Sequence, residues 1–449
     1  MPGLIGPDDI RTVSEAALDT PGADGVEVLV MHEWGGLTRF ADSAIHQSTA
    51  REDTGVKVRV VSGGRVGVAS SNDLSKDGAA AAARSALELA GMSAPDPNFP
   101  GLAPPGDVAG LEEGFDQETA DAGPERRAEG VAGLVETLGG GFHAAGAFET
   151  SASEVAVANT EGAWCYGPMT HAQVTTVVSG DDGAGFAEVT VPRVADLDPA
   201  SVGQRAFAKA RDSRGPHDLE PGRYEVVLEP PATATVLAFL AYLGLGGRAI
   251  IEGRSCFSGR IGEKLMGDRV TIYDDALSPL TIGLPFDFEG TPKRRVDLIV
   301  DGVVKGGVHD RRSAKQAGTE STGHALPPPN PEGPFPLNLF MEPGDSSIEE
   351  MVRSISRGLL VTRFHYSNVV HPREAVITGM TRDGTWLIED GEIVHPVKNF
   401  RFTQSIIEAL RDVELIGRDT ELASEFFFAS SRVPALKISS FNFTGKSDH

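Results

Sequence analysis

Residues 223–247 carry the sequence Arg-Tyr-Glu-Val-Val-Leu-Glu-Pro-Pro-Ala-Thr-Ala-Thr-Val-Leu-Ala-Phe-Leu-Ala-Tyr-Leu-Gly-Leu-Gly-Gly, in which a strand pattern changes into a helix pattern. Residues 223–230 alternate apolar and polar side chains, which predicts a strand. Pro231 suits the first turn of a helix, and the last two glycines suit its end. A helix that is apolar on every side lies inside a large domain or a membrane. Because the apolar run is too short to cross a bilayer, we expect a helix in a domain core.

Three further motifs follow this stretch in a fixed order. They are Ser255-Cys-Phe-Ser-Gly-Arg-Ile-Gly-Glu263, the acidic pair Asp274-Asp275 and Phe286-Asp-Phe-Glu-Gly-Thr-Pro292. The series resembles the TldD/PmbA family, once described as modulators of DNA gyrase and understood as two-subunit metallopeptidases. The resemblance covers nearly the whole chain. Paired carboxylates in these motifs could serve acid–base chemistry, but their spacing favours turns between strands.

The resemblance also indicates which branch of the family the chain is similar to. In the catalytic TldD-type subunit the helix carries His-Glu-x-x-x-His, and the matching positions here are Ala238, Phe239 and Leu243. Zinc needs imidazole, thiolate or carboxylate ligands, so these side chains cannot bind it. The family's third ligand is a cysteine near the C-terminus, and the matching residues 426–434 contain serines but no cysteine. The resemblance therefore implies a PmbA/TldE-like chain without catalytic residues, with zinc expected in a TldD-type partner.

Composition excludes several other classes of protein. The 449 residues include 64 acidic and 40 basic side chains, a net charge of −24 that repels the phosphates of nucleic acids. No signal peptide or membrane span is visible at the N-terminus. Cys165 and Cys256 lack the spacing of a disulfide framework or metal site, and a buried thiol is the expected role of Cys256. We expect a cytoplasmic protein that binds neither membrane nor nucleic acid.

The order of strand and helix patterns predicts an α+β fold. We expect four parts, namely an N-terminal α+β unit (1–92), a proline-rich linker (93–124), a central α+β unit (125–215) and a strand-rich C-terminal domain (222–449). The first two units are interpreted as one N-terminal α/β domain.

A weak internal repeat supports that interpretation. Val60-Val-Ser-Gly63 recurs as Val177-Val-Ser-Gly180, each followed by a strand and a helix, which is typical of repeated β-β-α units. Chance similarity between glycine-rich hairpins explains the repeat equally well. Hairpin turns are predicted at Trp34-Gly35-Gly36, Asp383-Gly384 and Asp390-Gly391.

The family resemblance implies that an unfolded peptide enters a cavity between two subunits. Edge strands near two turns could pair with such a peptide, which makes Phe257, Ser258, Gly259, Glu289 and Gly290 candidate contacts. The expected assembly is a heterodimer with a TldD-type subunit that degrades unfolded peptides or processes leader peptides, or else a homodimer.

Two alternatives to this function stay open. The chain could be a metal-dependent peptidase in its own right, with a relocated site around His324, His365 and His371. It could also be a homodimeric peptide-binding protein without an enzymatic partner.

Overall fold

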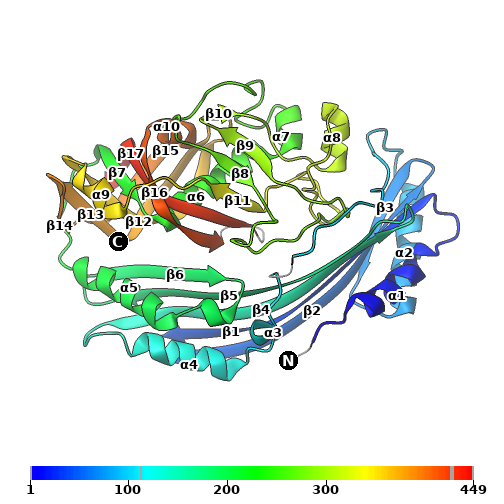
Figure 1. Cartoon of the computed structure of the whole chain (residues 1–449), viewed down its shortest axis with the longest axis horizontal. Helices are drawn as coiled ribbons and strands as arrows, with labels where there is room; N and C mark the ends of the chain where they lie inside the picture. The colour runs from blue at the N-terminus through cyan, green and yellow to red at the C-terminus, as the bar shows by residue number, and fades with distance from the viewer. Residues whose placement is uncertain (1–2, 112–113, 425–428, 447–449) are drawn as a thin grey trace.

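The computed structural model describes residues 3–111, 114–424 and 429–446, and it has a mixed α+β fold built on two sheets (Figure 1). An antiparallel sheet with helices forms the N-terminal part, and a large mixed sheet forms the C-terminal part. The α+β class predicted from the sequence is confirmed in this form. No helix within the described ranges is long and apolar enough to cross a membrane.

The N-terminal sheet has six strands in the order β3-β2-β1-β4-β5-β6. Each half contains three consecutive strands, and the halves meet where β1 pairs with β4 in antiparallel register. The strands are β1 (Gly25–Ala41), β2 (Ala44–Ser62), β3 (Arg65–Ser71), β4 (His143–Asn159), β5 (Trp164–Ser179) and β6 (Ala184–Val191). The helices are α1 (Pro7–Leu18), α2 (Lys76–Met92), α3 (Gln117–Ala120), α4 (Pro124–Val135), the 3₁₀ turn Val194–Asp196 and α5 (Pro199–Asp212).

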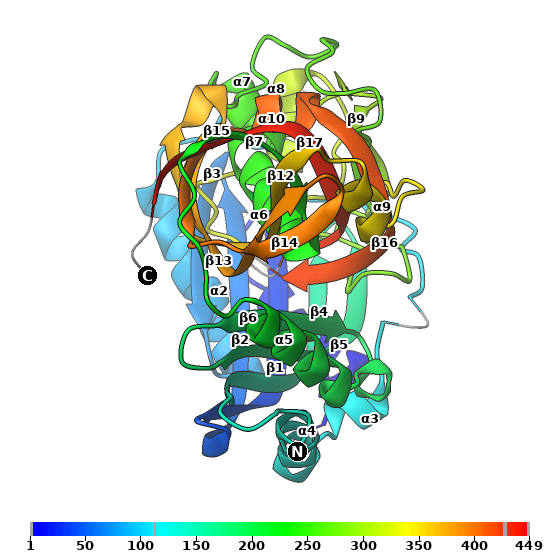
Figure 2. The ribbon, with the colours of Figure 1, turned by 90° about the vertical axis from the view of Figure 1, so that its left-hand side faces the viewer.

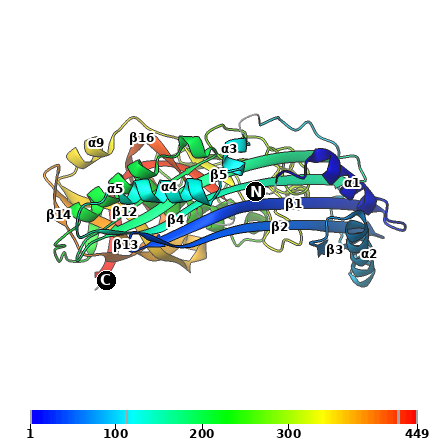
Figure 3. The same cartoon turned by 90° about the horizontal axis from the view of Figure 1, so that it is seen from below.

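This sheet is the middle layer of the molecule, so that β1 is buried on both faces. On one face, Val28 and Val30 pack in the same core as Ile10 of α1 and the alanines of α2. On the other face, Leu29 packs with Leu284 and Phe286 from the C-terminal part. Figure 3, seen from below, shows the helices in front of the long strands and the C-terminal part behind them. Because both faces of β1 are buried, the C-terminal part lies directly against the sheet, and a site can form between the two parts of the chain.

The turn predicted at Trp34-Gly35-Gly36 is wrong, because β1 runs unbroken through these residues. The hairpin to β2 instead turns at Asp42 and Ser43, whose φ angles are 49° and 59°. Glycine is required at positions 35 and 36 of this strand because a larger side chain would collide with its neighbours. A Cβ atom on Gly35 would lie 2.5 Å from a backbone oxygen of β4, and one on Gly36 would lie 2.1 Å from the guanidinium of buried Arg127.

The C-terminal sheet contains eleven strands and curls until β17 pairs with β7. The strands are β7 (Gly222–Leu228), β8 (Ile272–Asp274), β9 (Val296–Val300), β10 (Val303–Val304), β11 (Asn338–Met341), β12 (Arg357–His371), β13 (Val376–Glu389), β14 (Glu392–Pro396), β15 (Phe400–Ser405), β16 (Val413–Ser424) and β17 (Ser430–Lys446). The helices are α6 (Pro230–Leu240), the π-helical turn Ala241–Leu245, α7 (Gly247–Ile251), α8 (Arg311–Ala317), α9 (Ile348–Arg353), the 3₁₀ turn Pro372–Glu374 and α10 (Ile406–Arg411).

The strand followed by a core helix that the sequence predicted is confirmed as β7 and α6. Each residue of α6 except Pro231 is buried, and the helix packs against β12 and β17 in the largest apolar core. Figure 2 shows α6 framed by the strands of the curled sheet. The helix is therefore held on several sides, and its residues Thr235 and Phe239 line a cavity that Phe186 of β6 also lines.

Candidate functional site

Helix α6 and the π-helical turn after it place the three positions of the degenerate zinc motif in apolar surroundings. Ala238, Phe239 and Leu243 are only 6%, 7% and 5% exposed. The π-helical turn after α6 widens the helix and brings residues five positions apart toward one face, a rare geometry that is frequent at functional sites. The backbone would thus suit a pair of ligands at 238 and 243, but the side chains offer no nitrogen, oxygen or sulfur atom. Zinc does not fit this set of residues.

A cavity of about 320 Å³ lies between α6 and the N-terminal sheet. Thr235 and Phe239 line it from α6, Phe186 lines it from β6, and His365 lines it from β12. Burial, together with the positive charges of Arg382 and Arg363, lowers the pKa of His365. The imidazole of His365 is therefore harder to protonate than a histidine in water.

The three histidines of the alternative metal site do not come together. His365 lines the cavity beside α6, and His371 is exposed at the end of β12. His324 is fully buried and pairs with Asp274. In the ranges that the structure describes, no group of three or more histidine, cysteine or acidic side chains is placed to hold a metal ion. Residues 426–428 of the segment matching the cysteine ligand lie outside those ranges.

The peptide-contact candidates separate into two places. Phe257 is 0% exposed and packs in the C-terminal core against Gly244, so it cannot line a cavity. The Ser258 hydroxyl donates to the carbonyl of Ile250, and Gly259 is an exposed turn residue with φ of 76°. Phe257 is therefore a structural residue, contrary to the expectation from its motif.

The other two candidates, Glu289 and Gly290, lie in the turn 286–292 where the C-terminal part meets the N-terminal sheet. Asp287 shapes this turn, accepting hydrogen bonds from the backbone N–H groups of Glu289 (3.0 Å), Thr291 (2.9 Å) and Ala325 (2.9 Å). The carbonyl of Gly290 faces the buried thiol of Cys165 at 3.5 Å. The turn predicted from the acidic spacing is confirmed.

The thiols themselves show no sign of reactivity. Both cysteines are buried and free. Burial raises the pKa of each thiol to about 12. The expected role of Cys256 as a small buried side chain is confirmed, since a nucleophile requires the thiolate.

A buried charge cluster ties the turn to the N-terminal sheet, and we call its members Glu27, Arg59 and Glu289 the seam cluster. The Arg59 Nη1 atom lies 3.0 Å from Glu289 Oε1 and 3.1 Å from Glu27 Oε1. The contact to Glu27 lacks hydrogen-bond geometry, and neither carboxylate oxygen of Glu27 has a hydrogen-bond partner among the described residues. Sequence reasoning missed this cluster, because charges alternating with apolar residues on β1 and β2 are also typical of a solvent-facing side.

Burial, opposed by Arg59, raises the pKa of Glu27 from 4.5 to about 8, and burial with the charge of Glu289 raises the pKa of Asp287 to about 7. Between pH 4.5 and 8 the folded protein therefore holds protons that the unfolded chain has released, so stability falls as the pH rises through this window. We expect Glu27→Gln to raise the free energy of unfolding by about 1–3 kcal/mol at pH 8.5 and to change it by less than about 0.5 kcal/mol at pH 4.5, where the folded state has not yet diverged from the unfolded chain in protons bound. Urea denaturation at both pH values measures the difference.

Glu33→Gln is the matched control for that experiment, because Glu33 lies on the same strand in a more exposed pair with Arg51. It should change stability by less than about 1 kcal/mol at either pH. An equal loss of stability at both pH values in Glu27→Gln would contradict the prediction.

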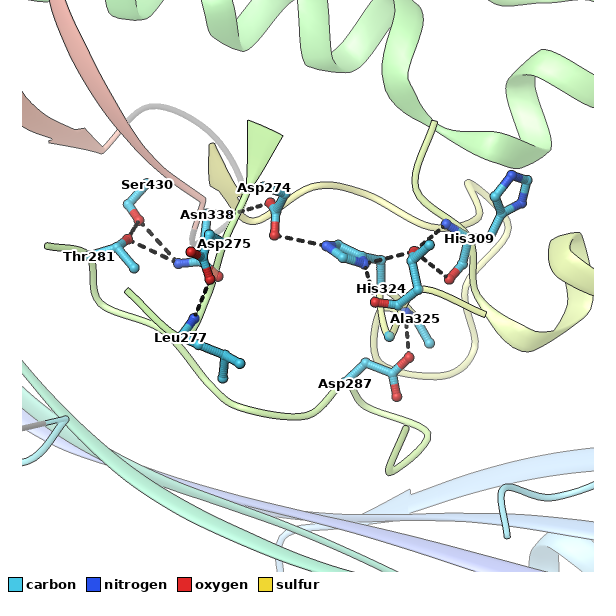
Figure 4. Close-up of polar contacts among 12 residues, drawn as sticks. Asp274, Asp275, Leu277, Thr281, Asp287, His309, His324, Ala325, Asn338 and Ser430 are labelled. Atoms are coloured by element: carbon cyan, nitrogen blue, oxygen red, sulfur yellow. Dashed lines mark hydrogen bonds and ion pairs between the residues drawn. The ribbon is translucent and has the colours of Figure 1, made fainter. Parts of the chain in front are cut away.

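A second buried network lies beside the turn (Figure 4). Asp274 Oδ1 pairs with His324 Nε2 at 2.9 Å, and Asp274 Oδ2 accepts from the backbone N–H of Asn338 at 2.7 Å. Burial raises the pKa of Asp274, but His324, Lys293 and the Asn338 N–H together outweigh it and hold the pKa below its usual value. Asp275 points elsewhere and accepts from the N–H of Leu277. The acidic pair is thus one buried ion and one turn residue, with no shared proton.

A cavity of about 470 Å³, which we call the chamber, lies between these networks and the N-terminal sheet. Both parts of the chain contribute to its walls. Apolar side chains dominate the lining, among them Met31, Val155, Met169, Leu284, Phe286 and Phe288. A concave, mainly apolar cavity with a few polar groups is typical of a binding site.

Comparisons with known proteins agree with these observations. Residues 221–445 match the family described as PmbA/TldA metallopeptidase C-terminal domain, and residues 26–90 match PmbA/TldA metallopeptidase domain 1. A Methanothermobacter thermautotrophicus metalloprotease is 27% identical over 46% of this chain and 45% of its own length. The chain thus aligns with less than half of that relative. Metalloprotease PmbA of Escherichia coli O157:H7 is 24% identical over 93% of this chain and 92% of its own length.

Two solved structures share the fold. TldE from Thermococcus kodakarensis superposes with a TM-score of 0.87 and 22% identity, covering 98% of this chain and 99% of its own. A protein of Thermotoga maritima described as a modulator of DNA gyrase superposes with a TM-score of 0.87 and 18% identity, covering 97% and 100%.

Proposed function

Because the chain belongs to the PmbA/TldA metallopeptidase family, we propose that it is a PmbA/TldE-like subunit that binds no zinc and pairs with a separate TldD-type zinc subunit. The observation that carries the proposal is the apolar set Ala238, Phe239 and Leu243 on a helix whose π-helical turn would suit ligands. The partner would supply the metal and the activated water.

In this proposal the chain contributes peptide contacts and half of an enclosed cavity. The partner cleaves unfolded peptides or leader peptides, and this chain holds them through the chamber and the strand edges near it. The two free, buried thiols suit the reducing cytoplasm as the compartment. A homodimer of this chain would bind peptides without cutting them.

The test compares the lone chain with the chain co-expressed with a TldD-type protein from the same genome. After exposure to zinc and desalting, mass spectrometry should find far less than one zinc per lone chain and about one zinc per pair, as expected for one catalytic site. Only the co-purified pair should cleave an unfolded peptide.

His365→Ala serves as the control, because His365 belongs to the alternative metal site. About one zinc per lone chain, lost in His365→Ala, would instead establish an enzyme in its own right. Failure of the two proteins to co-purify would favour the homodimeric peptide-binding protein.

A further inference from the structure

Lys293 is a buried lysine in the wall of the chamber, and no carboxylate of the described residues pairs with it directly. Its side chain belongs to a residue that is only 6% exposed. Burial lowers the pKa of Lys293, and the negative charges of Asp274 and Asp287 oppose that shift. No hydrogen bond or ion pair within 4 Å joins its amino group to the part of the chain that the structure describes. A buried charge left unpaired is costly, and a bound anion would remove that cost.

Glu154 in the chamber wall and Asp274 beside it are engaged by other partners, and Glu33 and Asp53 also line the chamber. Glu154 accepts from His32 Nδ1 at 2.8 Å, from the Tyr166 hydroxyl at 2.9 Å and from the N–H groups of Ile5 and Gly6. Asp274 is held by His324 and Asn338. These carboxylates are therefore fixed in place, and the Lys293 ammonium group is left for a ligand.

The rest of the lining selects an apolar ligand. The chamber volume of about 470 Å³ lies within the range of small-ligand pockets. Phe286, Phe288 and Leu284 line it from the C-terminal part, opposite Met31 and Val155 of the N-terminal sheet. Lys57 from β2 also lines the chamber, so two lysines stand beside the acidic residues Glu33, Asp53 and Glu154 in the lining. A ligand that fits these walls carries an apolar group and a negative charge a few atoms away.

We propose that the chamber binds the C-terminal end of a peptide, with Lys293 pairing with the terminal carboxylate and the apolar walls holding a large apolar last side chain. This inference rests on the peptide-binding part of the proposed function and names the end of the peptide that this subunit recognises. The chain thereby selects peptides by their last residue, independently of where a partner cuts them.

The test uses a tetrapeptide, acetyl-Ala-Ala-Ala-Leu, with either a free carboxylate or a C-terminal amide, titrated into the full chain by calorimetry. The acid should bind about tenfold or more tightly than the amide, as expected for a charge-assisted contact. Lys293→Met should abolish this preference, and Lys293→Arg should retain most of it. Replacing the last leucine with glycine should weaken the acid further.

Lys305→Met is the matched control, since Lys305 is exposed and outside the chamber lining. Equal affinity of acid and amide would overturn the role of Lys293 while leaving peptide binding intact. If neither peptide binds but the chain still forms an active pair with a TldD-type subunit, this inference is wrong and the proposed function stands. A Lys293→Met variant that keeps the preference, with an unchanged circular dichroism spectrum, would also overturn it.

Discussion

Replacing Arg59 with methionine is expected to lower the free energy of unfolding by about 3–5 kcal/mol, because it removes the cation of a buried cluster and leaves the Glu289 carboxylate without its counter-charge. Arg59 contacts both Glu27 and Glu289, and its side chain is 12% exposed. Methionine keeps much of the length of the side chain, so the change tests the charge more than the packing. Urea denaturation followed by circular dichroism measures the loss.

The same variant should loosen the turn 286–292, which Arg59 holds against the N-terminal sheet through Glu289. A loss of about 3 kcal/mol corresponds to amide exchange roughly 100-fold faster in that turn. Arg51→Met is the control, because Arg51 pairs with Glu33 and Glu149 on the surface of the same sheet and should cost less than about 1 kcal/mol. Unchanged exchange in the turn would show that the seam cluster does not join the two parts.

Replacing Asp274 with alanine should cost a similar amount, about 3–5 kcal/mol. Asp274 is fully buried, and the change would leave His324 Nε2 and the Asn338 N–H without their acceptor. Lys293 would also lose a nearby negative charge. The free energy of unfolding at pH 7, again from urea denaturation, is the measurement.

Two further variants show whether the ion or only the hydrogen bonds matter at this position. Asp274→Asn can still accept from the Asn338 N–H and hydrogen-bond to His324, so it should lose less than half as much as alanine. Asp275→Ala, on the neighbouring turn residue, should cost only about 0.5–1.5 kcal/mol for its one hydrogen bond to Leu277. Equal losses for Asp274→Ala and Asp275→Ala would contradict the assignment of Asp274 as the buried partner.

Local patterns in the sequence predicted the parts of the fold that depend on local physics. The alternation in 223–230 and the uniformly apolar residues after Pro231 predicted β7 and a core helix, and both are confirmed. The turn at Asp390-Gly391 is also confirmed, with φ angles of 49° and 82°. Family resemblance located Ala238, Phe239 and Leu243, which the structure places together on α6 and its π-helical turn.

Features that depend on distant contacts were not predictable from local patterns. Asp383 and Gly384 lie within β13 although their sequence is typical of a turn. The Asp383 carboxylate there pairs with Arg363, and Gly384 lies against the ring of Trp386. In the same way, Gly36 makes room for Arg127, a residue far along the chain. The counter-ions of Arg59, and the lack of a direct partner for Lys293 among the described residues, depend on how the two sheets meet. Patterns in a single sequence carry no information on that arrangement.

Because the chamber has walls from both parts of the chain, ligand binding and the cohesion of the molecule are linked equilibria. A ligand present at 100 times its dissociation constant would add about 2.7 kcal/mol to the stability of the folded state. By reciprocity, separation of the two walls lowers the affinity for the ligand. The factor is the same as that by which the bound ligand disfavours the separation. The melting curve of the chain is therefore itself a ligand assay, one that requires neither a catalytic partner nor a known reaction.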